Sequence, residues 1–484
     1  MSAGVWTIDY SPSLAVNVID VDIGKTLTIG MTPKLPVTKT GLGKLVATQG
    51  LSQGITLNQG GLDIGGTEMN VTAAIVTNGA YVGFYNGVCK DAGSSKWDLG
   101  NDTPAEWIIG SGATFSGVKR LVLSPESADR ACRLLIKDGG QLETGSDISY
   151  IQNHDLGKTV IEITGKGSTW NSGGEIRMIP SNDYDCDNPR ADLIVKDGGE
   201  LYSKVRLSWG QSGNDHKATN PEGYMLVSNA TVRVDDCIDF GIKATHTWSG
   251  DWLSTGSYKA EFIDHAYIKA QRIFVGRDRQ NVTVTFDGAT FESRGNSSDF
   301  LMQDSRADAP FVVTGKGLTV VANHNTVIKG SFQGDGGITK QGTDKIDISW
   351  SQHFTGALQC DSGTINDTSS GGLKFATGAI VMNGGVMNLS TVAFTNEVVA
   401  LALNGGEMHV FDNGTVESRT VGDLTLGGGF VFRFDVSSEG TDKFAVQDGY
   451  EVVVAATAEN PFVFAPNVLS ALPLNVPYTV IEGA

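Results

Sequence analysis

The chain has little of what builds helices, disulfide scaffolds or transmembrane segments. Its 484 residues include only five cysteines and 13 prolines. Scattered cysteines without a Cys-x-x-Cys pair exclude a disulfide framework, a zinc ribbon and a thioredoxin-type motif. No apolar run is long enough for a transmembrane helix. Because no long apolar series at helical spacing occurs either, we expect an all-β protein.

Positive charge is also scarce. Lys and Arg number 36 against 54 Asp and Glu, which gives a formal net charge of -18. A chain of this sign repels phosphate backbones and anionic lipid, so we expect no nucleic-acid partner and no membrane insertion by this segment. Charged residues make up 19% and apolar residues 40%, a balance typical of a folded chain rather than a disordered one.

A secretion leader is missing as well. Residues 1–4 lead directly into polar and strand-like residues, without the basic and apolar regions of a signal peptide. Residues 477–484 end within a strand-like pattern. We therefore expect an excised piece of a longer exported protein whose leader and tail were removed.

Glycine, in contrast, is abundant, with 62 residues. It recurs in a shared strand–turn–strand pattern, seen best in residues 135–142 (LIKDGGQL) and 194–201 (IVKDGGEL). Weaker copies are found at residues 226–232, 262–268, 285–291, 381–387 and 403–408. Recurrence of this kind is the signature of stacked structural repeats.

The turn has a physical reason. Asn, Asp or Gly before Gly or Ala tolerates positive φ and allows a tight corner. A β-hairpin would use the same residues. However, the flanking strands repeat along the chain instead of pairing off. We predict a right-handed, single-stranded parallel β-helix with coils of roughly 20–25 residues. Its expected parts are an N-terminal cap (1–30), the β-helix with loop inserts (31–457) and a C-terminal end segment (458–484).

Several segments resemble repeats of autotransporter (type V secretion) passengers. Residues 37–45 (VTKTGLGKL) followed by 54–62 (GITLNQGGL) are similar to the autotransporter-associated β-strand repeat, and residues 338–346 (ITKQGTDKI) form a degenerate copy. Residues 161–170 (IEITGKGSTW) resemble a second repeat type, with a weaker copy at 312–317.

A third piece, residues 424–444, resembles the last coils of such passengers. The resemblance implies a pectin-lyase-like solenoid that is secreted or held at the outer membrane or cell surface of a bacterium. It carries no catalytic residues. An adhesin-like, non-enzymatic role is the function that it implies, with extracellular glycans, matrix or a second copy of the chain as partners.

Aromatic side chains are the main candidates for ligand binding. Tyr and Trp rings can stack on sugars, and loops on one side of a solenoid commonly form its binding face. The alternative is that these rings pack the loops onto the coils. The candidates in the middle third of the chain are Tyr202, Trp209, Tyr224, Trp248 and Trp252.

The densest carboxylate cluster contains Asp183, Asp185 and Asp187. Alternating Asp oxygens can converge on calcium, which makes it the only candidate cofactor. An EF-hand loop is excluded, because its sixth and twelfth positions would be Asn188 and Ile194 instead of Gly and Glu. A solvated loop of turn-forming residues is the alternative.

Two other functions remain open. A polysaccharide lyase or glycoside hydrolase on the same fold could use Asp235, Asp236 and Asp239, and Arg277 and Arg279 could supply the basic side. Strand alternation would place Asp235 and Asp239 on one face and Asp236 on the other. Nothing ties this cluster to the arginines, so we assign no catalytic residue. The second alternative is a structural fibre or surface-layer component.

Overall fold

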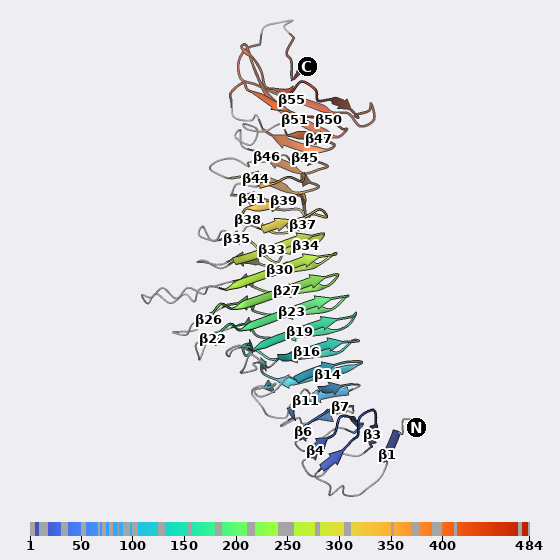
Figure 1. The fold of residues 1–484 in the computed structure, drawn as a ribbon. Helices are drawn as coiled ribbons and strands as arrows, with labels where there is room; N and C mark the ends of the chain where they lie inside the picture. Colours follow the sequence, from blue (N-terminus) through green and yellow to red (C-terminus); the bar gives the residue numbers. More distant parts are fainter. Residues whose placement is uncertain are drawn as a thin grey trace. The chain divides into compact units, whose positions relative to one another are not determined.

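The structure is a computed structural model, and the part of it described below is entirely β and turn, with no helix (Figure 1). It divides into two compact units. Unit 1 comprises Met1–Glu261, Val275–Val282 and Ser305–Asp308, and unit 2 comprises Phe262–Phe274, Thr283–Asp304 and Ala309–Ala484. The structure describes residues 5–8, 18–30, 37–49, 55–65, 68–69, 74–76, 81–85, 87–90, 97–98, 105–123, 131–152, 157–179, 186–210, 218–240, 256–275, 281–303, 311–349, 353–368, 378–389, 399–410, 414–472 and 477–482.

Unit 1 contains three long sheets. The first sheet is formed by β1 (Val5–Ile8), β3 (Thr26–Ile29), β5 (Lys44–Ala47), β7 (Gly61–Ile64), β10 (Tyr81–Phe84), β13 (Ala105–Ile109), β16 (Ala131–Lys137), β19 (Lys158–Thr164), β23 (Arg190–Lys196) and β27 (Glu222–Ser228). The second sheet is formed by β8 (Glu68–Met69), β11 (Gly87–Lys90), β14 (Ala113–Val118), β17 (Gln141–Thr144), β20 (Thr169–Ser172), β24 (Glu200–Ser203) and β28 (Thr231–Val234). The third sheet is formed by β12 (Trp97–Asp98), β15 (Leu121–Leu123), β18 (Ser149–Ile151), β21 (Ile176–Met178), β25 (Arg206–Trp209) and β29 (Cys237–Phe240). Two small sheets consist of β2 (Val18–Asp20), β4 (Val37–Thr40), β6 (Ile55–Leu57) and β9 (Ala74–Val76), and of β22 (Cys186–Asp187) and β26 (Ala218–Thr219).

Unit 2 repeats this plan. Its first sheet contains β36 (Phe311–Val313), β39 (Phe332–Gly334) and β42 (His353–Phe354). Its second sheet contains β31 (Tyr267–Ala270), β34 (Ala289–Ser293), β37 (Leu318–Val321), β40 (Ile338–Gln341), β43 (Leu358–Cys360), β45 (Ala379–Met382), β47 (Ala400–Leu403), β50 (Leu424–Leu426) and β54 (Val452–Val454). Its third sheet contains β35 (Ser297–Gln303), β38 (Thr326–Lys329), β41 (Lys345–Ile348), β44 (Thr364–Asp367), β46 (Val386–Asn388), β48 (Gly406–His409), β51 (Phe430–Ser437), β52 (Gly440–Thr441) and β55 (Val463–Val468). A small sheet joins β49 (Ser418–Val421), β53 (Lys443–Val446) and β56 (Ile481–Glu482). Three strands hold residues of both units: β30 (Ser257–Ile263), β32 (Arg272–Val275) and β33 (Asn281–Asp287).

Successive coils visit the three sheets in turn. In unit 1 the chain passes from β16 to β17 and β18, then returns to the first sheet as β19. β16 pairs in parallel with β13 and β19, and Figure 1 shows β16, β19, β23 and β27 as neighbouring arrows that run the same way. This arrangement confirms the predicted all-β, parallel β-helix. The handedness of the coil and the boundaries 1–30, 31–457 and 458–484 stay predictions.

The recurring Asp-Gly turn makes the corner between sheets. Asp138 and Gly139 both have positive φ, at 53° and 80°, and the Gly140 N–H donates to the Lys137 carbonyl at 2.9 Å. This is the conformation of a type I′ turn. However, the turn does not close a hairpin, because β16 and β17 each pair with other coils. The predicted cornering role is confirmed, and the hairpin alternative is wrong here.

The core consists of columns of apolar side chains from successive coils. One column runs through Leu134, Ile161, Leu193 and Met225, which are paired in register on β16, β19, β23 and β27. All four side chains are buried. Because parallel strands lie about 4.8 Å apart, each inward side chain packs on its counterparts above and below.

A buried lysine occupies the same position in both copies of the Lys-[Thr/Gln]-Gly motif. In unit 1 the Lys39 ammonium donates to the carbonyls of Thr40, Gly41 and Gln59, at 2.8, 2.7 and 3.0 Å. Burial lowers the pKa of Lys39. The lysine therefore satisfies the carbonyl groups of one corner and ties that corner to the next coil.

In unit 2 the Lys340 ammonium donates to the carbonyls of Gln341, Gly342 and Ser362, at 2.8, 2.9 and 2.9 Å. Burial lowers its pKa to about 8. The two motif copies thus share one local structure, which we call the lysine cage.

Coil length differs between regions. In unit 2, the contacts Gln341–Asp361, Asn383–Asp361 and Asn404–Asn383 span 20, 22 and 21 residues, as predicted. In the middle of unit 1, the contacts between neighbouring coils span more residues, 27 for Arg133–Glu106 and 33 for Tyr202–Asp235. Longer loops between the strands account for the difference, because the paired strands stay in register.

Candidate functional site

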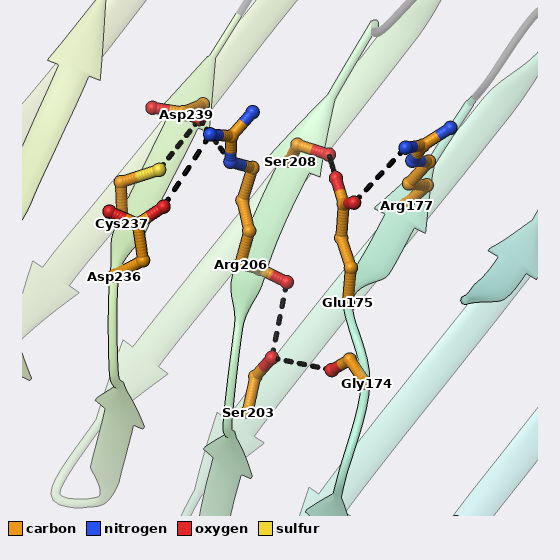
Figure 2. A network of polar contacts seen from close by, with 9 residues as sticks. All are labelled: Gly174, Glu175, Arg177, Ser203, Arg206, Ser208, Asp236, Cys237 and Asp239. Carbon is orange, nitrogen blue, oxygen red and sulfur yellow. Dashed lines mark hydrogen bonds and ion pairs between the residues drawn. The ribbon is translucent and has the colours of Figure 1, made fainter. Parts of the chain in front are cut away.

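A polar network lies on three successive coils at the third sheet of unit 1. β21, β25 and β29 supply most of its members, and the others come from the end of β24 and from the corners before β21 and β29. Figure 2 shows the nine residues of the network: Gly174, Glu175, Arg177, Ser203, Arg206, Ser208, Asp236, Cys237 and Asp239.

The parallel register explains why these residues meet. Arg206 is paired with Cys237, and Ser208 is paired with Asp239. Arg177 is paired with Ser208 on the other side. Residues that are far apart in the sequence thus become direct neighbours on adjacent strands.

Asp239 is the most deeply placed charge of the network. It is fully buried, and its Oδ2 lies 3.2 Å from Arg206 Nε. The Cys237 thiol donates to the same oxygen at 2.9 Å. Arg206 Nη2 also lies 3.5 Å from Asp236, so one guanidinium serves two carboxylates, as Figure 2 shows. A buried carboxylate is tolerated only when it is paired in this way.

Electrostatics fix the charge state of the network. Burial by itself would lower the pKa of Arg206, but the adjacent Cys237, Asp239 and Glu175 outweigh it, and the pKa is raised. Burial, followed by the Asp239 carboxylate, raises the pKa of the Cys237 thiol. Because the thiolate is the nucleophilic form, Cys237 is a hydrogen-bond donor and not a reactive group at neutral pH.

A second branch of the network starts at Glu175. Its Oε1 accepts a hydrogen bond from Ser208 Oγ at 3.3 Å, and its Oε2 lies 3.1 Å from Arg177 Nη2. The Ser203 hydroxyl lies 3.1 Å from the carbonyls of both Gly174 and Arg206, which holds two neighbouring corners together. The network therefore fixes positions of charge across three coils.

The predicted aromatic residues have different surroundings. The Tyr202 hydroxyl donates to Asp235 at 3.0 Å, and the Tyr224 hydroxyl donates to Glu261 at 2.5 Å; both rings are half-buried. Trp209 is fully buried and stacks on Phe240 with ring centroids 5.0 Å apart. Trp209 therefore packs in the core. Trp248 and Trp252 lie outside the described residues.

Asp235, Asp236 and Asp239 do not lie on one continuous strand, as the predicted alternation of faces assumed. Asp235 and Asp236 lie in the corner between β28 and β29, whereas Asp239 lies within β29. This corner interrupts the alternation of faces. As a result Asp236, and not Asp235, shares Arg206 with Asp239.

Most of the predicted basic and calcium-binding residues lie outside the residues that the structure describes. Arg277, Arg279, Asp183 and Asp185 lie outside the described residues, and Asp187 is described only as part of β22. Within the described ranges no group of three His, Cys, Asp or Glu side chains is placed to hold a metal ion. Calcium binding stays a prediction.

The outer face of the first sheet of unit 1 carries a second polar arrangement. Arg133 lies 2.6 Å from both Glu106 and Glu162, and Glu162 lies 3.0 Å from Lys196. Burial by itself would raise the pKa of Glu162, but hydrogen bonds from Arg133 and Lys196 outweigh it and lower the pKa. We call this run of four residues on β13, β16, β19 and β23 the ion ladder.

Apolar residues lie directly beside the ion ladder. The register pairs Leu135 with Glu162, Glu162 with Ile194, and Ile194 with Leu226. These residues alternate with the inward core residues of their strands, so they share the outer face. Sequence inspection missed both the ion ladder and Arg206. The only available signal was the strand alternation, which places Arg133 and Glu162 outward.

Comparison with protein-family models, with curated proteins and with solved structures finds no match to this chain. In the part of the chain that the structure describes, no helix combines the length and the apolar character needed to cross a membrane.

Proposed function

We propose that this chain is a bacterial cell-surface β-helix, a non-enzymatic passenger or adhesin-like segment that binds an extended glycan or matrix polymer. The binding surface is the outer face of the first sheet of unit 1, along the ion ladder. Export and surface location belong to the same proposal.

The repeated lysine cage supports the link to exported passengers. Lys39 and Lys340 come from the two segments that resemble the autotransporter-associated repeat, and each ammonium meets three carbonyls in the same pattern. A shared local structure supports the interpretation that both segments are copies of one repeat, rather than chance matches in a glycine-rich chain.

The ion ladder and its apolar neighbours are the observation that carries the binding proposal. Register is continuous from β13 through β16, β19, β23 and β27, so like positions recur once per coil. Charged and apolar outward side chains alternate from coil to coil in these columns, so a polymer lying along the face meets both kinds of group over a few coils. Many weak contacts along such a face multiply into useful affinity.

The charge state favours binding over bond cleavage. Hydrolysis by a carboxyl pair needs one acid whose pKa is raised, so that it holds a proton near neutral pH. On this face the pKa of Glu162 is lowered by Arg133 and Lys196 despite its burial, and that of Glu261 is lowered by Lys259 and Tyr224 despite its burial. Ionised, paired carboxylates of this kind bind and orient ligands instead of donating protons.

A glycan and matrix-protein array with the full chain tests the proposal. The key variant is Lys196→Glu, which reverses one charge of the ion ladder. Lys345→Glu in unit 2 is the matched control, because both lysines are paired with a carboxylate and are about equally exposed. We expect at least tenfold weaker binding for Lys196→Glu and unchanged binding for Lys345→Glu.

Two results would overturn the proposal. One is the absence of any array ligand for the intact chain. The other is equal binding by Lys196→Glu and the unmodified chain. New reducing ends or unsaturated products released from a bound polysaccharide would instead favour the lyase or hydrolase alternative.

A further inference from the structure

Two tyrosine rings on the outer face of the first sheet of unit 1 lie over glycines. A Cβ atom at Gly61 would collide with Cε1, Cζ and Oη of Tyr81. A Cβ atom at Gly83 would lie 2.5 Å from Cε2 of Tyr85, and one at Gly110 would lie 2.5 Å from Cε1 on the opposite edge of the same ring. Each ring therefore lies across the backbone, in space that a neighbouring side chain would otherwise fill. We call the two rings and the three glycines the tyrosine platform.

The strand register explains why this space is open to the rings. Tyr81 begins β10 and is paired with Gly61 of β7 on one side and with Glu106 of β13 on the other. Val82 is fully buried, so Tyr81 and Gly83 point outward. Glycine within a strand weakens it, because it packs no side chain, and often marks a place where another group approaches the backbone closely. Here that group is an aromatic ring, and both rings of the platform are half-buried.

The charges beside the platform are paired. Glu106, the first member of the ion ladder, lies 2.6 Å from Arg133, and Asp63 lies 2.8 Å from Lys44. Burial, followed by the nearby Asp63 carboxylate, raises the pKa of Tyr81 to about 12. The phenol therefore keeps its proton at neutral pH and is a hydrogen-bonding group rather than a charge. The platform thus presents uncharged rings at one end of the ion ladder, among charges that already have partners.

This chemistry matches one face of a sugar ring. A pyranose has a face of C–H groups that stacks on a neutral aromatic ring, and its hydroxyls both donate to carboxylates and accept from guanidinium groups. A charged sugar would have to compete with the existing ion pairs, and a phosphate polymer is disfavoured by the net charge of -18. A peptide that adds to a sheet needs an open strand edge, whereas β10 is paired on both sides. Together these features favour an uncharged sugar chain.

A further half-buried tyrosine stands in the same column of outward residues as Tyr81. The column runs, one residue per coil, through Tyr81, Glu106, Arg133, Val160, Asp192 and Tyr224. Because parallel strands lie about 4.8 Å apart, its two ends are separated by about 24 Å. One sugar of an extended β-linked hexose chain has nearly the same length as this coil spacing. Such a chain therefore meets one coil per sugar and reaches from the tyrosine platform to Tyr224 with about six sugars.

We propose that the tyrosine platform is a stacking subsite for an uncharged, β-linked hexose chain that crosses the coils of unit 1 and stacks again on Tyr224. The proposal rests on the binding role proposed for the ion ladder, and it adds the class of ligand and the two ends of its path. Between the tyrosines, sugar hydroxyls meet Glu106 and Arg133, whose side chains are 36% and 42% exposed. Stacking at both ends and polar contacts between them multiply into one affinity.

Titration calorimetry of the full chain with cellohexaose and chitohexaose tests the ligand class. Both are uncharged, β-linked hexasaccharides. Cellotriose and chitotriose are the length controls, because a trisaccharide reaches only one of the two tyrosine sites. We expect at least one hexasaccharide to bind, and to bind at least tenfold more tightly than the corresponding trisaccharide.

Three variants test the position of the rings. Tyr85→Ala and Tyr224→Ala each remove one stacking surface, whereas Gly83→Ala keeps every ring and displaces that of Tyr85 by its methyl group. We expect each variant to weaken hexasaccharide binding at least tenfold, with denaturant midpoints showing that it is folded. Tyr267→Ala is the matched control, since Tyr267 is a half-buried tyrosine on the second sheet of unit 2 whose hydroxyl donates to Glu292. Its binding should equal that of the unmodified chain.

Four outcomes would overturn the proposal. Binding that is unchanged in Tyr85→Ala and Gly83→Ala but weaker in Lys196→Glu removes the platform and leaves the ion ladder as the binding surface. An array ligand that is a protein or an anionic glycan, without binding of either hexasaccharide, removes the ligand class and leaves the proposed function. An equal loss in Tyr267→Ala assigns the effect to general destabilisation. The absence of any ligand removes both the platform and the proposed function.

Discussion

The polar columns on the third sheet differ between the two units. In unit 1, neighbouring coils present unlike residues, and Arg206 and Asp239 form a pair of which one member is fully buried. In unit 2, the corresponding sheet carries a ladder in which Asn366 Nδ2 donates to Asp347 at 2.7 Å and Asn388 Nδ2 donates to Asn366 at 2.6 Å.

The two units thus differ in kind: unit 2 repeats one type of amide contact, whereas unit 1 combines unlike charged residues. An asparagine side chain both donates and accepts, so identical residues satisfy one another coil after coil. A guanidinium only donates and a carboxylate only accepts, so the unit 1 network works with one arrangement of residues. Losing one member there should leave a buried charge without its partner. Losing one amide in unit 2 should remove only ordinary hydrogen bonds.

The largest effect is expected for Arg206→Met, which removes the guanidinium beside the buried Asp239. We expect the free energy of unfolding to fall by about 3 kcal/mol at pH 7, because breaking a buried pair strands the remaining charge. Arg233→Met is the control, since Arg233 lies exposed on β28. Denaturant unfolding together with amide hydrogen exchange in β25 and β29 measures the loss.

The pH dependence sharpens this test. Without Arg206, the pKa of Asp239 in the folded variant should rise above its unfolded value. The loss of stability is then fully present above the raised pKa and shrinks as the pH falls through it. Equal, pH-independent losses in Arg206→Met and Arg233→Met would show that the buried pair has no special role.

The fold was accessible from the sequence because its corners are chemically distinctive. Asp138 and Asp197 adopt positive φ beside a glycine, as the Asp-Gly pattern predicts. That pattern alone is equally compatible with a hairpin. The recurrence of the flanking strands decided between the two, since stacked coils repeat a strand and hairpins pair neighbours.

The site was harder to predict, for two reasons. Trp209 is a sugar-stacking residue by type, but its place two residues after the buried Leu207 turns it inward. The partners Arg206 and Asp239 meet only through the register between coils whose length varies with the loops. No local spacing rule in the sequence encodes that register, so the contact became visible only in the structure.

Both units contain a lysine cage. For its removal we expect a loss of stability between that of Arg206→Met and that of Asn366→Ala. Replacing Lys340 by Met leaves three carbonyls without their donor while removing a buried charge. We expect a loss of about 2 kcal/mol in the free energy of unfolding. Lys39→Met should show a similar loss, and Lys345→Met, at a lysine whose side chain is 43% exposed, should show little. Denaturant midpoints of the full chain compare the three variants.

The lowered pKa of Lys340 adds a pH signature. Its folded pKa of about 8 lies below the ordinary value of 10.5, so the unfolded chain holds more protons between these pH values. This residue therefore makes the unmodified chain more stable as the pH rises from about 8 to 10.5. The buried Cys360, with a pKa raised to about 11 by burial, opposes this trend, and its charge interacts with that of Lys340. The comparison is therefore made in a Cys360→Ala background, where the difference between chains with and without Lys340→Met isolates the lysine, and a flat difference across this range would contradict the assignment.

We expect the smallest loss of stability for the asparagine side chains that hydrogen-bond from coil to coil in unit 2, such as Asn366 and Asn388. Asn366→Ala removes the bond that the half-buried amide donates to the Asp347 carboxylate and the bond that it accepts from Asn388, so we expect a loss of about 1.5 kcal/mol. Asn404→Ala removes one exposed bond, to Asn383, and should cost less. Neither variant leaves a buried charge behind, so the loss should not change between pH 5 and pH 8. Hydrogen exchange in β41, β44 and β46 measures the local effect of Asn366→Ala. A loss as large as that of Arg206→Met would mean that the repeated ladder of unit 2 depends on each member as strictly as the network of unit 1 does.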